Sequence, residues 1–245
     1  MKVLGLDTAT PLAGIAIVDG DRVLGEAREG TRGRGADLLV KIDLVCRTAG
    51  VAPAALEAIA IGAGPGSFTG LRIGMATAKG IAFAANRPLW AVSSLAALAD
   101  DARQELAADP AVPAGGVICA VLDARRGEVF AGCFRDGIAL APERVMAPAE
   151  LAAWVAEVTE AAGAGPAPHV WFAGDAIDAH RDALAALPAH GPWLAARTPS
   201  GCAVARLALA GTRVDITLGG VPTYIRPSEA EVKYPDGVPG ALRRR

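Results

Sequence analysis

The sequence contains few aromatic residues, few lysines and no closely spaced cysteines. Aromatic side chains make up 4% of the 245 residues, and lysine occurs four times while arginine supplies the other twenty basic residues. The four cysteines form no C-x-x-C pair, which is typical of buried thiols in a reducing compartment. The net charge of −2 excludes a general electrostatic attraction to nucleic acid.

Long apolar runs are also missing. No stretch approaches the roughly 20 uninterrupted apolar residues of a membrane span. Asp7 interrupts the first apolar run too early for a signal peptide. We therefore expect a cytoplasmic protein with no membrane partner. A chain of 245 residues can bury an ample core, either in one large domain or in two lobes.

Histidine is absent from the first 168 residues. His169, His180 and His190 follow, and no two of them lie three to five residues apart. A pair of metal-binding histidines on one face of a helix needs that spacing. We therefore predict neither a metal site nor a metalloprotease.

The segment 57–84, EAIAIGAGPGSFTGLRIGMATAKGIAFA, carries the strongest pattern in the chain. It predicts a short buried strand at residues 58–61, a glycine-rich elbow, and a helix from Gly70 to Ala84 whose only charged residues are Arg72 and Lys79. A helix that is apolar all round must be buried all round. Its own sheet covers one side, and either a second chain or tight packing within the same core covers the other.

The elbow also suggests an anion site, because backbone N–H groups at a helix N-terminus attract anions and Ser67 or Thr69 can cap the helix. Neither standard phosphate fingerprint fits. Lys79-Gly80 lies inside the helix rather than in a Walker A loop, and Thr69 stands where a dinucleotide motif needs its third glycine. A tight strand-to-helix turn accounts for the glycines equally well.

Two segments, 3–24 and 117–140, share one layout. Each predicts a strand ending in an aspartate (Asp7, Asp123), a polar turn, a second strand, an Asp-Gly hairpin turn and a third strand. Helices and further strands follow in both halves. This order predicts an α/β protein with two tandem ribonuclease-H-like lobes, as in the actin/Hsp70/sugar-kinase architecture. A single mixed α/β domain is the alternative.

The predicted lobes are residues 1–109, which hold the apolar dimerisation helix, and residues 110–245. The Gly-Pro-rich stretch 109–116 marks their boundary. The last helices are expected to pack back on the first lobe. Residues 235–245, which end in three arginines, are expected to form a flexible, solvated tail.

The stretch GAGPGSFTGLRIGMATAKGIA closely resembles the signature of the TsaB family, formerly called YeaZ. LGLDTAT near the N-terminus, the SSLAALA run from Ser93, and PTYIRP at residues 222–227 are similar to segments of that family. The resemblance implies a two-lobed, actin-like protein needed for threonylcarbamoyladenosine, the modified adenosine beside the anticodon of tRNA. It also implies a non-catalytic protein that forms a heterodimer with the catalytic paralogue TsaD through the first lobe.

The resemblance further implies an ATPase partner, TsaE, and contact with tRNA through the complex. The resemblance also implies that the chain can form a homodimer when alone, through an overlapping surface. No cofactor is intrinsic on this interpretation, and ATP or ADP with Mg²⁺ acts at the level of the complex.

A vestigial nucleotide or anion site is expected where actin-like enzymes hold metal and phosphate. Asp7 is retained, but the turn after it has glycine only at Gly14, and Arg125 and Arg126 occupy the corresponding turn of the second lobe. The candidate residues are Asp7, Thr8, Gly64, Gly66, Ser67, Thr69 and Asp123. The alternative function is a stand-alone actin-like ATP-dependent kinase or ATPase of a small metabolite, with the two aspartates holding magnesium through water.

The recurrence of Gly70, Gly74 and Ala78 every four positions allows a second helix to approach closely. We therefore predict a partner interface along this helix, with Arg72 and Lys79 at its polar rim. Its residues are Gly70, Leu71, Arg72, Ile73, Gly74, Met75, Ala78, Lys79 and Ile81. On this prediction, Gly74→Leu breaks the heterodimer and leaves the monomer folded.

Overall fold

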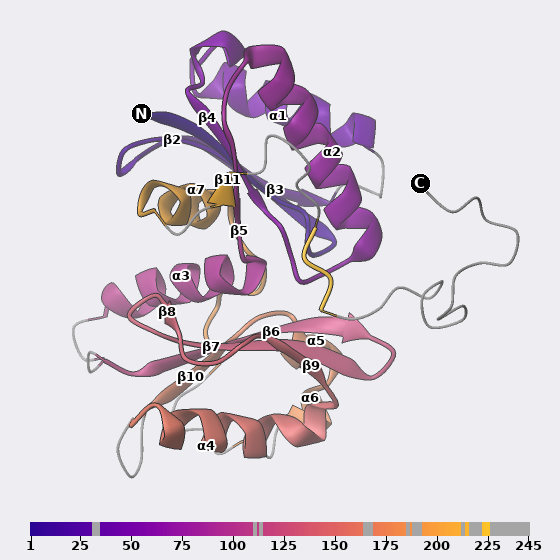
Figure 1. The fold of residues 1–245 in the computed structure, drawn as a ribbon, viewed down its shortest axis with the longest axis vertical. Helices are drawn as coiled ribbons and strands as arrows, with labels where there is room; N and C mark the ends of the chain where they lie inside the picture. Colours follow the sequence, from indigo (N-terminus) through magenta and orange to yellow (C-terminus); the bar gives the residue numbers. More distant parts are fainter. Residues whose placement is uncertain are drawn as a thin grey trace, which may run out of the picture.

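The protein is built from five layers in a computed structural model (Figure 1). Helices α1 and α2 cover the outer face of a six-stranded sheet, and α3 and α7 lie between this sheet and a second one of five strands. Helices α4, α5 and α6 cover the outer face of the second sheet. The predicted fold class, two mixed sheets flanked by helices, is confirmed. The structure describes residues 1–30, 35–109, 112, 115–163, 169–184, 187, 193–211, 214–215 and 222–225.

The first sheet begins with an antiparallel meander and continues with parallel strands. Asp19-Gly20 forms the turn between the second and third strands, with Gly20 in the left-handed region, as the Asp-Gly pair predicts. The sheet order is β11-β5-β4-β1-β2-β3. The strands are β1 (Lys2–Asp7), β2 (Leu12–Asp19), β3 (Arg22–Gly30), β4 (Ala58–Gly62), β5 (Leu89–Val92) and β11 (Val214–Asp215).

Serine side chains cap the N-termini of two helices in this half of the chain. The Ser67 hydroxyl accepts a hydrogen bond from the Gly70 N–H at 3.3 Å and caps α2, and Ser93 caps α3 in the same way. Asn86, with a φ of 50°, ends α2 in the left-handed conformation. The helices of this half are α1 (Gly35–Thr48), the short η1 (Pro53–Ala55), α2 (Phe68–Ala85) and α3 (Ser94–Ala107).

The second sheet repeats the meander. Asp136 and Gly137 both have a positive φ and form the predicted hairpin turn, and the last long strand lies parallel to the first. The strands are β6 (Val117–Arg125), β7 (Glu128–Arg135), β8 (Ile138–Ala139), β9 (Arg144–Met146) and β10 (Val170–Ala173). The helices are η2 (Pro148–Glu150), α4 (Leu151–Ala161), α5 (Ala176–Ala179), α6 (Arg181–Leu184) and α7 (Gly201–Leu209).

Helix α7 comes late in the chain but packs on the inner face of the first sheet. Its first turn lies so close to β1 that a Cβ at Gly5 would stand 2.0 Å from the Gly201 carbonyl oxygen. Glycine at both positions permits this backbone approach. The second half of the sequence thus contributes a layer to the first lobe.

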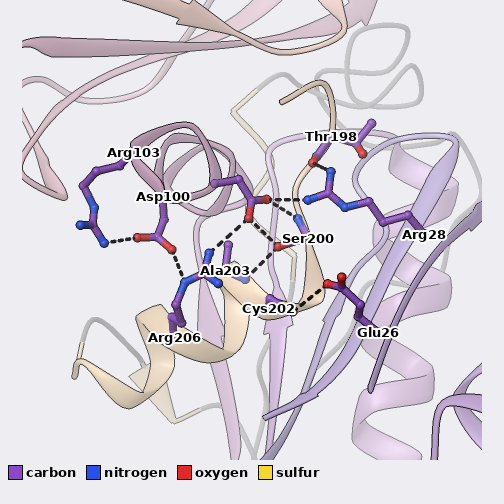
Figure 2. Close-up of polar contacts among 10 residues, drawn as sticks. Glu26, Arg28, Asp100, Arg103, Thr198, Ser200, Cys202, Ala203 and Arg206 are labelled. Carbon is purple, nitrogen blue, oxygen red and sulfur yellow. Dashed lines mark hydrogen bonds and ion pairs between the residues drawn. The ribbon is translucent and has the colours of Figure 1, made fainter. Parts of the chain in front are cut away.

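A polar network ties α7 to α3 and β3 (Figure 2). Asp101 accepts hydrogen bonds from the Ser200 N–H at 2.8 Å and from the Ser200 hydroxyl at 2.6 Å. The Arg206 guanidinium bridges Asp100 at 2.7 Å and Asp101 at 3.2 Å, and Arg28 also reaches Asp101. These contacts place the N-terminus of α7 and hold the central layer together.

Apolar packing joins α3 to the second sheet. Leu95, Leu98 and Ala102 of the helix share one buried cluster with Leu122 and Trp171 of the strands. Ala97 of the same helix belongs to the buried cluster on the inner face of the first sheet, so α3 packs between the two sheets. Within the described ranges, no helix is both long and apolar enough to cross a membrane. The predicted tail, residues 235–245, lies outside the described residues, and the predicted lobe boundary stays a prediction.

Candidate functional site

The end of β1 is sealed inside the protein. The Asp7 side chain has no exposed surface, and it accepts hydrogen bonds from the Ser94 hydroxyl at 2.6 Å and from the Ala9 N–H at 2.8 Å. Burial raises the pKa of Asp7 to about 6, and the two hydrogen bonds oppose that rise. This geometry suits a carboxylate that orders the turn at Ala9 and the first turn of α3.

Thr8 fills the space left by two glycines of α2. Its hydroxyl donates to the Gly70 carbonyl oxygen at 2.9 Å. A Cβ at Gly70 would stand 2.2 Å from the Thr8 carbonyl oxygen, and one at Gly74 would stand 2.1 Å from Thr8 Oγ1. These glycines therefore allow α2 to approach the β1 turn of its own chain, whereas the sequence analysis assigned them to a partner helix.

The elbow glycines are packed against the same chain in a similar way. A Cβ at Gly66 would stand 2.5 Å from the Ala9 carbonyl oxygen, and the Ser67 N–H donates to that oxygen at 2.7 Å. Gly64, with a φ of +109°, faces Leu71 and the carbonyl oxygen of Thr223. Thr69 is exposed. A tight turn accounts for Gly64 and Gly66, and the predicted anion site stays a prediction.

Asp123, at the corresponding position of the second lobe, has different neighbours. The Arg125 guanidinium lies 3.0 Å from one carboxylate oxygen, and the Arg125 N–H and His180 Nε2 lie 2.8 and 3.2 Å from the other. Arg125 and Arg126 adopt positive φ values of 63° and 59° in the hairpin that follows. Asp7 and Asp123 are therefore held by separate sets of groups.

Sequence reasoning missed His180 and Asp175 in this second cluster. It considered His180 only as a metal ligand, yet the side chain is 15% exposed and lies beside Asp123. Asp175 accepts a hydrogen bond from the Asp123 N–H at 2.9 Å, and burial raises the pKa of Asp175. No spacing in the sequence links these residues, since β10 and α5 bring them together.

Over the residues with described positions, no cluster of histidine, cysteine and acidic side chains could hold a metal ion.

Helices α1 and α2 pack against each other on the outer side of the first lobe (Figure 1), and both carry exposed apolar side chains. Phe83 of α2 is 90% exposed, and Leu39, Val40 and Leu44 of α1 are each more than half exposed. An exposed apolar patch of this kind marks an interaction surface. We call it the helix-pair face and define it by Leu39, Val40, Leu44, Ala76, Gly80 and Phe83.

The predicted seam on α2 is partly wrong. Arg72 is exposed, and Gly70, Ile73, Lys79 and Ile81 are half-buried. Four further members of the predicted seam point into the core of the chain itself: Leu71, Gly74, Met75 and Ala78. The outward stripe of α2 instead passes through Phe68, Arg72, Ala76, Gly80 and Phe83, at the three- and four-residue spacings of one helix face. Sequence reasoning also missed the contribution of α1.

Comparison with known proteins identifies the family. Residues 35–216 match the family described as TsaD, tRNA N6-adenosine threonylcarbamoyltransferase. The structure superposes on YeaZ from Pseudomonas aeruginosa with a TM-score of 0.71 and 30% identity, over 91% of this chain and 99% of that one. The chain belongs to the TsaB (YeaZ) family.

Two curated relatives carry the name of this family. The tRNA threonylcarbamoyladenosine biosynthesis protein TsaB of Bacillus subtilis is 28% identical over 242 residues, which is 96% of this chain and 98% of the relative. TsaB of Escherichia coli is 33% identical over 130 residues, or 53% of each chain. The resemblance read from the glycine-rich signature is thus confirmed.

The buried Asp7 predicts a specific pH dependence. Its pKa is raised in the folded state from 3.8 to about 6, so its contribution to the free energy of unfolding is fully present below pH 3.8 and is lost as the pH rises through about 6. A pKa difference of about two corresponds to about 3 kcal/mol. We expect Asp7→Asn to remove this dependence, as measured by urea unfolding between about pH 4 and pH 7. Parallel stability profiles for the two proteins would contradict the assignment.

The two kinds of glycine on α2 predict opposite effects. Gly74→Ala forces a Cβ against Thr8, so we expect the free energy of unfolding to fall by about 1–3 kcal/mol. Gly80→Ala is the matched control, because no atom lies within 4 Å of its Cβ position, and we expect a gain of about 0.5–1 kcal/mol. Thermal and urea unfolding measure both. Gly74→Leu is correspondingly expected to destabilise the monomer itself.

Proposed function

We propose that the chain is a non-catalytic, activating subunit in the synthesis of threonylcarbamoyladenosine in tRNA, and that it acts as a heterodimer with a TsaD-type catalytic paralogue. The family relationship supports the biosynthetic role, because curated relatives are named for that pathway. The TsaD-type partner and the absence of catalysis go beyond what the names of these relatives say.

The helix-pair face is the observation that supports a heterodimer. Phe83 projects almost fully into solvent at the C-terminal end of α2, and the neighbouring helix α1 exposes Leu39, Val40 and Leu44. Burying a Phe or Leu side chain contributes about 1.5–3 kcal/mol each relative to leaving it exposed. A folded partner that covers this face therefore gains substantial apolar burial without any rearrangement of the sheet beneath.

Two observations support a subunit without its own chemistry. Asp7 is fully buried and hydrogen-bonded, so its carboxylate has no exposed surface for a metal–phosphate group. In the second lobe, the Asp123 carboxylate is engaged by Arg125 and His180. Residues of this kind order loops rather than hold magnesium. ATP or ADP with Mg²⁺ then acts at the level of the complex, together with a TsaE-type ATPase.

A reconstituted modification reaction tests this function. The catalytic paralogue, the ATPase and the enzyme that makes threonylcarbamoyl-adenylate are incubated with threonine, bicarbonate, ATP and tRNA, with and without this chain. We expect modified adenosine, quantified by mass spectrometry, only when the chain is present. Equal product in both reactions would contradict the activating role. Tight binding of ATP and Mg²⁺ by the isolated chain in calorimetry would instead support the alternative of a stand-alone kinase or ATPase.

A charge placed on the helix-pair face should separate binding from folding. Phe83→Asp is expected to weaken the heterodimer by at least about tenfold, because truncating a central aromatic anchor removes a large share of the binding energy. Isothermal titration calorimetry measures the affinity, and circular dichroism checks the fold. Ile138→Asp is the matched control, since Ile138 is 70% exposed on β8 of the second sheet. Equal losses from both variants would refute the placement of the interface.

A further inference from the structure

Arg72 is held in place by two aromatic rings at the start of α2. Its Cζ lies 3.8 Å from the centroid of the Phe68 ring, and its Nε donates a hydrogen bond to the Tyr224 hydroxyl at 3.1 Å. The two rings are themselves in contact, with centroids 5.2 Å apart. A guanidinium stacked on one ring and hydrogen-bonded to the other loses much of the rotational freedom of an exposed arginine.

The tyrosine is supplied by a segment far away in the sequence. Residues 222–225 lie against the elbow, where the Thr223 N–H donates to the Ala63 carbonyl oxygen at 2.7 Å. Ile225 packs against the buried cluster between α3 and the second sheet. Tyr224 therefore rests on a fixed backbone, and Arg72 is oriented before any partner arrives.

No carboxylate of the described residues forms an ion pair with Arg72. Arg28, Arg103 and Arg206 all pair with Asp100 or Asp101, at distances between 2.7 and 3.2 Å. By contrast, the contacts of Arg72 among the residues with described positions are the two rings alone. Within the described ranges, no hydrogen bond engages its Nη groups, so their donors can serve a group of a partner.

The position of Arg72 connects it to the helix-pair face. It lies one turn before Ala76 on the outward stripe of α2 that continues through Gly80 to Phe83. Among the 18 residues of α2, the charged ones are Arg72 and Lys79, and none is acidic. On α1, the exposed carboxylate of Asp43 is paired with Arg47 at 2.9 Å, and Asp37 in the first turn is half-buried. Two copies of this chain packed so that their Arg72 residues face each other would bring like charges together, whereas a partner with a carboxylate at this point would complement the face.

We propose that Arg72, oriented by Phe68 and Tyr224, binds a carboxylate side chain of the catalytic paralogue and makes the helix-pair face favour that partner over a second copy of this chain. This inference rests on the proposed function. The bidentate fork of an oriented guanidinium matches a carboxylate, and the surrounding apolar surface excludes water from the pair. The partner therefore presents an acidic residue beside apolar ones.

The test measures the affinity of the full chain for the purified catalytic paralogue by calorimetry at low and high salt. We expect Arg72→Gln to raise Kd about fivefold to tenfold and Arg72→Glu to raise it more than tenfold, with a weaker salt dependence for Arg72→Gln than for the parent chain. Arg144→Glu, an equal charge change at an exposed arginine of β9, is the control and should leave Kd within about twofold. Tyr224→Phe keeps the ring but removes the hydrogen-bond acceptor, and it should raise Kd about threefold.

Sedimentation measures self-association of the same variants, and Arg72→Gln should not weaken it. Reversing the charge of acidic residues of the paralogue one at a time should restore binding to the Arg72→Glu variant at one position.

Unchanged affinity of the Arg72 variants, or a loss of affinity with unchanged salt dependence, overturns the inference. So does unchanged heterodimer affinity with weakened tRNA binding, which would assign the cluster to RNA. If an Arg72 variant fails to fold, Tyr224→Phe decides the question. A parent chain that does not bind the paralogue overturns the proposed function instead.

Discussion

The close approach of the β1 turn to α2 is the contact on which the outer layer depends. Thr8 occupies the space of two missing side chains at Gly70 and Gly74, and Asp7 joins the same turn to α3 through Ser94. Close-packed interiors leave little room for adjustment, so this contact fixes the rotation of α2 about its axis. That rotation directs Met75 into the core and Phe83 outward. The surface offered to a partner is thus a consequence of a buried backbone contact.

The central layer has a different physical basis. Helices α3 and α7 are joined by ion pairs and hydrogen bonds among Asp100, Asp101, Arg206 and Ser200, most of which are shielded from solvent. Buried charges are retained where each has its partner, because an unpaired one costs several kcal/mol. Since α3 also packs on the second sheet, the network connects both sheets through one helix.

The sequence predicted local features well, but it did not predict which parts of the chain would pack against one another. The Asp-Gly turns, the Ser67 cap and the apolar helix were correctly predicted, because each depends on residues within a few positions of one another. The assignment of Gly74 to a partner interface was wrong, because a glycine that permits close approach does not reveal which backbone approaches it. His180 was missed for a related reason: its contact with Asp123 spans 57 positions and depends on how β10 and α5 are placed.

The sequence by itself determined the repeated meander, the glycine-rich elbow and the excess of apolar residues over what one helix can bury against one sheet. These follow from short-range rules of turn chemistry, capping and periodicity. Only the tertiary structure decided which side of α2 remains exposed, that α1 completes the surface, and that Tyr224 reaches Arg72 across 152 positions. Such long-range contacts arise when separate layers close-pack around shared cores, and no local pattern encodes the orientation that packing selects.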